Sequence, residues 1–363
     1  MRYVRALDGL RGVAVLLVVL LHFGYVNVGW IGVQFFFVLS GYLITGILLA
    51  DRERPFGGYL RRFYTRRVLR IFPLYYGYLL VLSAVHALTG GPEFFGRYAP
   101  WLFTYTYNYS RLAPDWQHSP FITHFWSLSV EEQFYLAWPL LVFALPRRAL
   151  RVAVVGILAA APLGRLWLSA HLRARGYDPA AAGDALYWFT LCQIDAFAAG
   201  AAIPVLGLPE KVAGRTRWLR GVALAWLAAG AAQLLALRAA GVRVPLTSLG
   251  FALPLTENLQ HVWGYSLLNL AAVACILLLL RRDPWVRPME AGWLVEAGKV
   301  SYGMYVLHWP VLALFQRLWS WEPKSGRGLG IFAVYLVVLF AACWLSYRFF
   351  ESRFLALKDR FAR

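Results

Sequence analysis

Long runs of continuously apolar residues recur along the whole chain and are separated by short polar segments. A helix needs ~20 apolar residues to cross the hydrocarbon core of a bilayer, and most of these runs approach that length. The runs do not alternate between apolar and polar positions, so a membrane β-barrel is disfavoured. The pattern predicts an all-α, polytopic membrane helix bundle with about ten transmembrane helices. The predicted spans are 8–27, 32–50, 71–88, 130–145, 152–169, 187–205, 219–237, 262–280, 300–317 and 330–347.

The basic residues between these runs predict the orientation. With the N-terminus inside, 25 of the 36 Lys and Arg residues fall on the inner side and 8 on the outer side. Cytoplasmic loops of membrane proteins carry such an excess of positive charge. We therefore expect both termini to be cytoplasmic and the protein to lie in a membrane of the bacterial cytoplasmic (inner) type.

Composition supports a membrane protein and disfavours other classes. Of 363 residues, 60% are hydrophobic and 15% charged, against roughly 25% charged in soluble domains. The net charge of +18 is spread between the apolar runs, so we assign it to topology and expect no nucleic-acid partner. The three cysteines lie inside apolar runs without metal-ligand spacing, and we expect no metal site. The chain is predicted to be one membrane domain, 1–363, with no appended soluble domain.

Two ionisable residues in the first predicted helix call for an explanation, because a central charge costs roughly 2.5–3.5 kcal/mol on insertion scales. Arg11 and His22 are eleven residues apart, which puts them on one helix face roughly 16 Å apart along the axis. Asp8, three residues before Arg11, could pair with it. Arg11 either reaches the inner headgroups or binds substrate, and His22 is either an internal histidine or a catalytic one.

A basic segment on the predicted inner side offers a site for phosphates. Arg66, Arg67 and Arg70 are spaced to share a helical face, and guanidinium groups bind phosphate bidentately. A positive anchor for anionic lipid is the alternative. In the preceding predicted helix, Ser40 and Gly41 would let a neighbouring helix approach closely, and Ser40 is also a candidate for substrate binding.

Two further segments carry polar groups that are candidates for a site. Glu131 and Tyr135 share a helix face, so the carboxylate could orient a catalytic histidine, or it could interact with the helix dipole. Glu132 points to another face. In the ninth predicted span, Tyr302 and His308 are candidates for substrate binding, although an internal, hydrogen-bonded histidine is an equal alternative.

Taken in order, these motifs resemble the acyltransferase 3 family of integral membrane acyltransferases. The resemblance covers nearly the whole chain and rests on five marks. They are Arg11 with ten residues before His22, Phe-Phe-x-Leu-Ser-Gly at 36–41, Arg-Arg-x-x-Arg-Ile-x-Pro at 66–73, Trp-Ser-Leu-Ser-Val-Glu-Glu-Gln-Phe-Tyr at 126–135, and Ser-Tyr…His at 301–308. The resemblance implies about ten membrane helices and transfer of an acyl group, often acetyl, from acyl-CoA to a sugar hydroxyl.

The residues and the resemblance together predict a mechanism. Acyl-CoA, a co-substrate and not a tightly bound cofactor, would place its phosphates on the arginine cluster and Arg11. His22, oriented by Glu131, would act as general base on a hydroxyl of a carbohydrate, glycolipid or glycosylated small-molecule acceptor, with Tyr302 or His308 stabilising the oxyanion. The alternative is a proton-coupled transporter or flippase of a glycolipid or saccharide, in which Arg11, His22 and Glu131 form a proton or substrate path. A polyprenyl-linked glycosyltransferase is a third possibility, disfavoured because no acidic metal or sugar-nucleotide site is evident.

Overall fold

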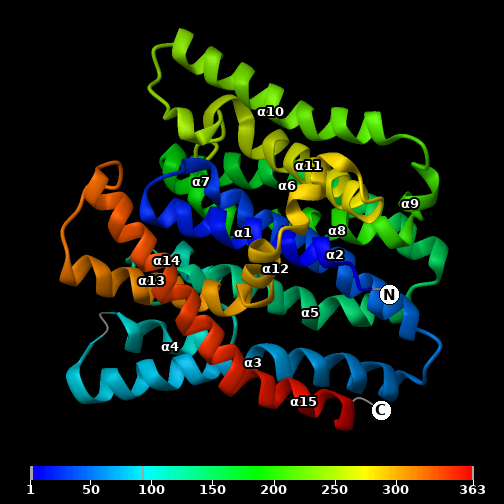
Figure 1. Ribbon diagram of the computed structural model, residues 1–363. Helices are drawn as coiled ribbons and strands as arrows, with labels where there is room; N and C mark the ends of the chain where they lie inside the picture. Colours follow the sequence, from blue (N-terminus) through cyan, green and yellow to red (C-terminus); the bar gives the residue numbers. More distant parts are fainter. Residues whose placement is uncertain (1–2, 92–93, 114, 362–363) are drawn as a thin grey trace. The chain divides into compact units, whose positions relative to one another are not determined.

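The computed structural model describes residues 3–91, 94–113 and 115–361. In these residues all regular structure is helical, with fifteen α-helices joined by short 3-10 segments and one π turn. Every one of the ten predicted spans falls on a helix, so the predicted all-α membrane bundle is confirmed (Figure 1). The physical reason is that a continuously apolar segment can satisfy its backbone in lipid only as a helix or in a closed barrel.

Within the described part of the chain, seven helical segments are long and apolar enough to cross a membrane, and a bent pair of helices would make an eighth. The bent pair is α7 (Pro179–Trp188) and α8 (Thr190–Val205), whose axes differ by 49°. The seven segments contain α1 (Arg5–Phe23), α2 (Ile31–Asp51), α3 (Phe56–Thr89), α6 (Arg147–Ala174), α10 (Thr216–Ala239), α11 (Gln260–Leu280) and α14 (Gly326–Ser346).

Two other predicted spans are helical but less apolar. They are α5 (Trp126–Ala144) and α13 (Ser301–Leu318). Both carry candidate site residues, and those polar groups lower the hydropathy of the helices that hold them. The number of ten spans and the cytoplasmic location of both termini therefore remain predictions.

Many large apolar side chains stay exposed on the long helices, as expected where helices face lipid. On α6, Val152, Leu163 and Trp167 are each at least 66% exposed. On α14, Val337 is 69% exposed. In water such surfaces would promote association, whereas in a bilayer they match the acyl chains.

The helices form two compact units. Unit 1 comprises residues 1–49 and 144–299, and unit 2 comprises residues 50–143 and 300–363. Each unit is thus assembled from two separate stretches of chain.

In unit 1, α1 packs against α12 (Gly292–Lys299) through glycines at nearly backbone contact (Figure 1). A Cβ added at Gly12 would lie 2.1 Å from the carbonyl oxygen of Leu294, and one at Gly298 would lie 1.7 Å from that of Asp8. Gly9 meets the carbonyl of Met289 in the same way. Only glycine fits these positions, which explains the glycines that flank Arg11 in the sequence.

A second glycine contact in unit 1 joins α2 to α8. A Cβ at Gly41 would lie 2.0 Å from the carbonyl oxygen of Phe197, and one at Gly200 would lie 1.9 Å from that of Val38. The predicted role of the Ser-Gly segment in close helix packing is therefore confirmed for Gly41. A buried side-chain hydrogen bond, from Gln34 Nε2 to Gln193 Oε1 (2.7 Å), joins the same two helices.

A buried ion pair ties three helices of unit 1 together. Arg165 of α6 is fully buried and binds Asp195 of α8 through two parallel hydrogen bonds of 2.9 Å. Its Nη2 also donates to Ser266 Oγ of α11 (2.9 Å). Because a charge in the membrane interior requires a partner, this pair explains how α6 tolerates an arginine among its apolar residues.

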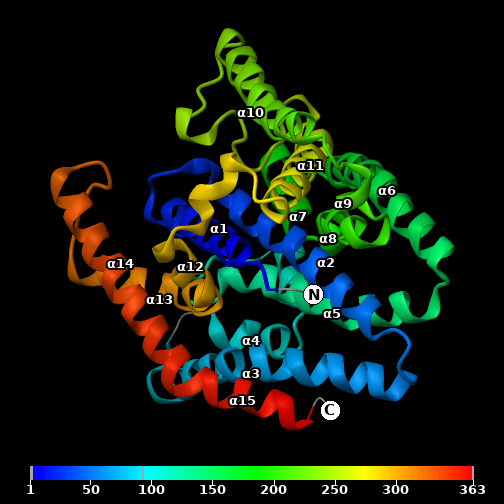
Figure 2. The same ribbon diagram turned by 45° about the vertical axis from the view of Figure 1, so that its right-hand side comes forward.

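Unit 2 is built on α3, which runs for 34 residues through Pro73. Tyrosine hydroxyls on α3 donate to backbone carbonyls of its neighbours: Tyr59 to Pro139 of α5 (3.0 Å) and Tyr75 to Leu102 (2.9 Å) of α4 (Phe95–Phe103). The last helix, α15 (Ser352–Phe361), lies along α3. In Figure 2, α13 and α14 run side by side as a hairpin in the same unit.

Candidate active site

The first helix holds Arg11 and His22 as the sequence predicts, and both side chains are half-buried. Arg11 Nη1 donates to Asp8 Oδ1 at 2.7 Å, so the predicted pairing with Asp8 is confirmed. The hydroxyl of Tyr3 donates to the other carboxylate oxygen (2.8 Å). Arg11 is therefore held in place at the start of α1, and its positive charge is partly balanced.

His22 lies in the last turn of α1, directly before a fixed helix end. Gly24 has φ of 93°, a conformation that glycine adopts without steric cost, and the amide of Tyr25 bonds back to the carbonyl of Leu20. A histidine in the last turn of a helix faces the negative end of the helix dipole.

In unit 2, α5 carries the predicted carboxylate. The hydroxyl of Tyr135 donates to Glu131 Oε1 at 2.5 Å, which confirms that the two residues share a face. The guanidinium of Arg67 on α3 lies 5.9 Å from the centre of the Tyr135 ring. Two predicted groups, the arginine cluster and the α5 carboxylate, thus meet at Tyr135.

The arginine cluster lies within one continuous helix. Because α3 is unbroken from Phe56 to Thr89, Arg66 and Arg70 lie one turn apart on a shared face, with Arg67 adjacent. All three are half-buried. Their shared role in binding a phosphorylated ligand remains a prediction.

Glu132 is a candidate that the sequence analysis set aside. Its Oε1 atom is buried and has no hydrogen-bond partner among the described residues, and Arg67 interacts with its charge. A buried carboxylate oxygen without a hydrogen bond is costly, so Glu132 joins the candidate site residues. Helix geometry pointed it away from Glu131, and no sequence signal showed that this other face is also buried.

His308 and Tyr302 of α13 are tied to neighbouring helices. His308 is fully buried, its Nδ1 lies 2.7 Å from the carbonyl oxygen of Tyr305, and its ring packs on that of His124. The Tyr302 hydroxyl donates to the carbonyl of Ile71 on α3 (2.9 Å). Of the two alternatives for His308, these contacts favour the internal histidine.

Three of the ten candidates, Arg11, His22 and Ser40, belong to unit 1. Ser40 is half-buried beside the glycine contact between α2 and α8. The other seven belong to unit 2. The structure brings together Arg67, Glu131 and Tyr135 in unit 2, whereas the interaction of His22 with Glu131 remains a prediction.

Residues 4–348 match a protein family described as an acyltransferase domain. The chain belongs to this acyltransferase family. The resemblance drawn from the five motifs is thereby confirmed, and with the apolar helices it makes the protein an integral membrane protein of the bacterial cytoplasmic-membrane kind.

Relatives of this chain are known in several bacteria. The peptidoglycan O-acetyltransferase OatA of Listeria monocytogenes is 28% identical, over 97% of this chain and 56% of its own length. The Bacillus subtilis protein YrhL, provisionally named a peptidoglycan O-acetyltransferase, is 28% identical over 97% of this chain and 55% of its own. The chain therefore spans little more than half the length of these relatives. No solved structure matches it.

Proposed function

We propose that this acyltransferase moves an acyl group, most simply acetyl, from acyl-CoA to a hydroxyl of a cell-envelope carbohydrate, with peptidoglycan as the first acceptor to test. The observation that carries the proposal is the match to the acyltransferase family over residues 4–348, which includes every candidate site residue. The names of the relatives, which specify O-acetyl transfer to peptidoglycan, support the acyl group and the acceptor class.

The donor would be recognised by its phosphates. Arg66, Arg67 and Arg70 lie on neighbouring positions of α3, and arginine binds phosphate oxygens in a planar, bidentate geometry. Arg11, held by Asp8, is the further candidate for this role. The positive-inside distribution supports the cytoplasmic placement of these arginines, which is the compartment that contains acyl-CoA.

His22 would accept the proton of the acceptor hydroxyl while that oxygen attacks the thioester carbonyl. The carbon–sulfur bond then breaks, and the proton returns to the departing thiolate. The position of His22 in the last turn of α1 supports this role, because the helix end stabilises the imidazolium that forms. Glu131 would orient the imidazole.

The oxyanion needs a hydrogen-bond donor. Tyr302 and His308 are the candidates from sequence, but the hydroxyl of Tyr302 already donates to Ile71. Tyr302 would have to exchange this bond for one to the substrate. A covalent acyl-histidine on His22 is a second route, in which CoA leaves before the acceptor binds.

The decisive experiment compares two histidine variants of purified protein in nanodiscs. With acetyl-CoA and soluble peptidoglycan fragments, His22→Ala should release no CoA above background. His171→Ala, which removes an exposed histidine from α6, should match wild type. Equal thermal midpoints for the three proteins would show that loss of activity is not loss of fold. Near-normal CoA release by His22→Ala would contradict the mechanism.

The same assay separates transfer from transport. A flippase or proton-coupled transporter would move a labelled glycolipid across proteoliposomes without any acyl donor. Translocation that is independent of acetyl-CoA, with no CoA release, would replace the acyltransferase proposal for this chain.

A further inference from the structure

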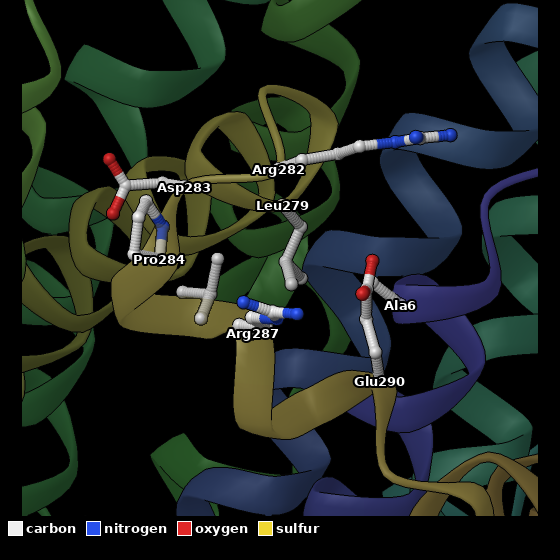
Figure 3. Close-up of a pocket in the computed structure, with 8 residues that line it drawn as sticks. Ala6, Leu279, Arg282, Asp283, Pro284, Arg287 and Glu290 are labelled. Carbon is white, nitrogen blue, oxygen red and sulfur yellow. The ribbon is translucent and has the colours of Figure 1, made fainter.

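A pocket of about 250 Å³ opens in unit 1 where two membrane helices end (Figure 3). Its lining includes Ala6, at the start of α1, and Leu279, at the end of α11. Both helices are long and apolar enough to span a membrane. A site that lies at the ends of two spans is at the depth of the lipid headgroups.

The wall of the pocket is a short segment between α11 and α12, the 3-10 helix η6 (Pro284–Glu290). The carboxylate of Asp283 accepts a hydrogen bond from the backbone amide of Trp285 (3.0 Å) and forms an ion pair with the guanidinium of Arg220 at 2.9 Å. Hydrogen bonding by Arg220 lowers the pKa of Asp283 below its usual value. This carboxylate is therefore ionised and already neutralised by its partner, so it does not repel an anion.

Two arginines at the pocket have no such partner. Arg282 and Arg287 line it, and the guanidinium of neither makes an ion pair or hydrogen bond with the described residues. Figure 3 shows the guanidinium of Arg287 beside Leu279. The carboxylate of Glu290 lies to the right of Arg287 in this view, and Asp283 lies to the left. With one carboxylate against two guanidinium groups, the pocket carries a net positive charge. Arg5, whose Nη2 lies 3.7 Å from the position of a Cβ on Gly292, adds a further positive charge to this surface.

Two exposed tryptophans lie in η6 and at the start of α12. Trp285 is 51% exposed and Trp293 is 66% exposed, although both are large aromatic side chains. Tryptophan is enriched where membrane proteins meet the headgroup layer. The combination of unpaired arginines with tryptophans is thus suited to a lipid surface.

We propose that this pocket, which we call the η6 pocket (Ala6, Leu279, Arg282, Asp283, Pro284, Val286, Arg287 and Glu290), binds the phosphate headgroup of an anionic phospholipid of the cytoplasmic leaflet. Arg282 and Arg287 bind the phosphate, while Trp285 and Trp293 contact the glycerol and upper acyl chains. The lipid is favoured over a soluble phosphate because the tryptophans and the ends of the spans place the pocket in the headgroup layer. The η6 pocket uses none of the residues of the arginine cluster on α3, and its proposed role does not depend on the proposed acyl transfer.

The test measures retained lipid by native mass spectrometry after detergent purification, with phosphatidylglycerol and phosphatidylcholine offered in equal amounts. Wild type should retain phosphatidylglycerol preferentially. The double variant Arg282→Gln/Arg287→Gln should lower that preference roughly thirtyfold, since each arginine near an anionic surface contributes about 1 kcal/mol.

The matched control is Arg147→Gln/Arg148→Gln. It removes the same charge from exposed residues of unit 1 that are also predicted to lie on the inner side, and it should keep the wild-type preference. An equal loss in this control would overturn the proposal, because it would assign the preference to overall charge. A wild-type preference for phosphatidylglycerol in Arg282→Gln/Arg287→Gln would also overturn the proposal.

A competition arm separates lipid from nucleotide. Adenosine 3′,5′-bisphosphate, which carries the phosphates of a nucleotide without an acyl chain, should not displace the bound phosphatidylglycerol from wild type. Displacement that is lost in Arg282→Gln/Arg287→Gln would overturn the lipid assignment in favour of a nucleotide site. Thermal midpoints of all variants show whether the exposed substitutions leave the fold intact.

Discussion

Removing one partner of the Arg165–Asp195 pair should destabilise unit 1 far more than removing both. Arg165→Met leaves the carboxylate of Asp195 buried without its cation, and Asp195 is only 1% exposed. Breaking a buried pair in this way costs about 3–5 kcal/mol, whereas replacing both partners by apolar residues of similar volume is often neutral or stabilising. In Arg165→Met/Asp195→Leu, the charge and its counter-charge disappear together.

The other hydrogen bonds of Arg165 increase the loss of stability that we expect when it is replaced. Besides Asp195, its Nη1 donates to the carbonyl of Cys192 (2.7 Å) and its Nη2 to Ser266 (2.9 Å), so one guanidinium joins α6, α8 and α11. Lysine has one ammonium group and cannot reproduce this planar set of bonds. We therefore expect Arg165→Lys to lie close to Arg165→Met in stability.

The assay is thermal unfolding in detergent, followed by the fraction of protein that stays monodisperse on gel filtration. The thermal midpoint of each single variant should fall by on the order of 10 °C. This value combines the loss of unfolding free energy given above with the usual shift of the midpoint per kcal/mol. The double variant should recover most of that loss. Arg173→Met, an exposed position on the same helix, should resemble wild type. A double variant as unstable as the worse single variant would refute the reasoning, as would single variants with wild-type midpoints.

Three further predictions concern other contacts. Gly12→Val should lower the thermal midpoint and CoA release together, because a side chain there overlaps the carbonyl of Leu294; unchanged values for both would contradict the backbone contact. Glu132→Gln should lower CoA release while leaving the midpoint within a few degrees, and a normal rate would remove Glu132 from the site. At pH 7, Asp283→Asn should be less stable than wild type. Because Arg220 lowers the pKa of Asp283, the wild-type advantage should shrink as the pH falls below about 4, which thermal unfolding across pH would reveal.

Hydropathy was enough to locate all ten predicted helices, because an apolar segment in lipid has few alternatives to the α-helix. It did not predict their limits. The helix predicted at 71–88 begins at Phe56, since the basic stretch before it continues the same helix outside the hydrocarbon core. The helix predicted at 187–205 is divided at Phe189, where the backbone becomes extended between α7 and α8.

The candidate site shows the same division between local and distant information. The pairs Asp8–Arg11 and Glu131–Tyr135 follow from helical spacing and are present in the structure. The partner of Arg165 could not be predicted, because Asp195 is 30 residues away and only packing of α6 against α8 brings them together. The burial of Glu132 likewise depends on which helices surround α5, and one sequence contains no signal for that.

The course of α1 has a consequence for the chemistry proposed along it. Carbonyl oxygens of Leu294 in α12 and Met289 in η6 fill the space that side chains on Gly12 and Gly9 would need, so the backbone of α1 is in direct contact with both segments. Arg11 and His22 lie on this one continuous helix, which fixes their separation along its axis. If Arg11 binds the donor and His22 reacts, as proposed, the distance between them has to be covered by the flexible arm of the donor, and the length of that arm would determine which donors can be used.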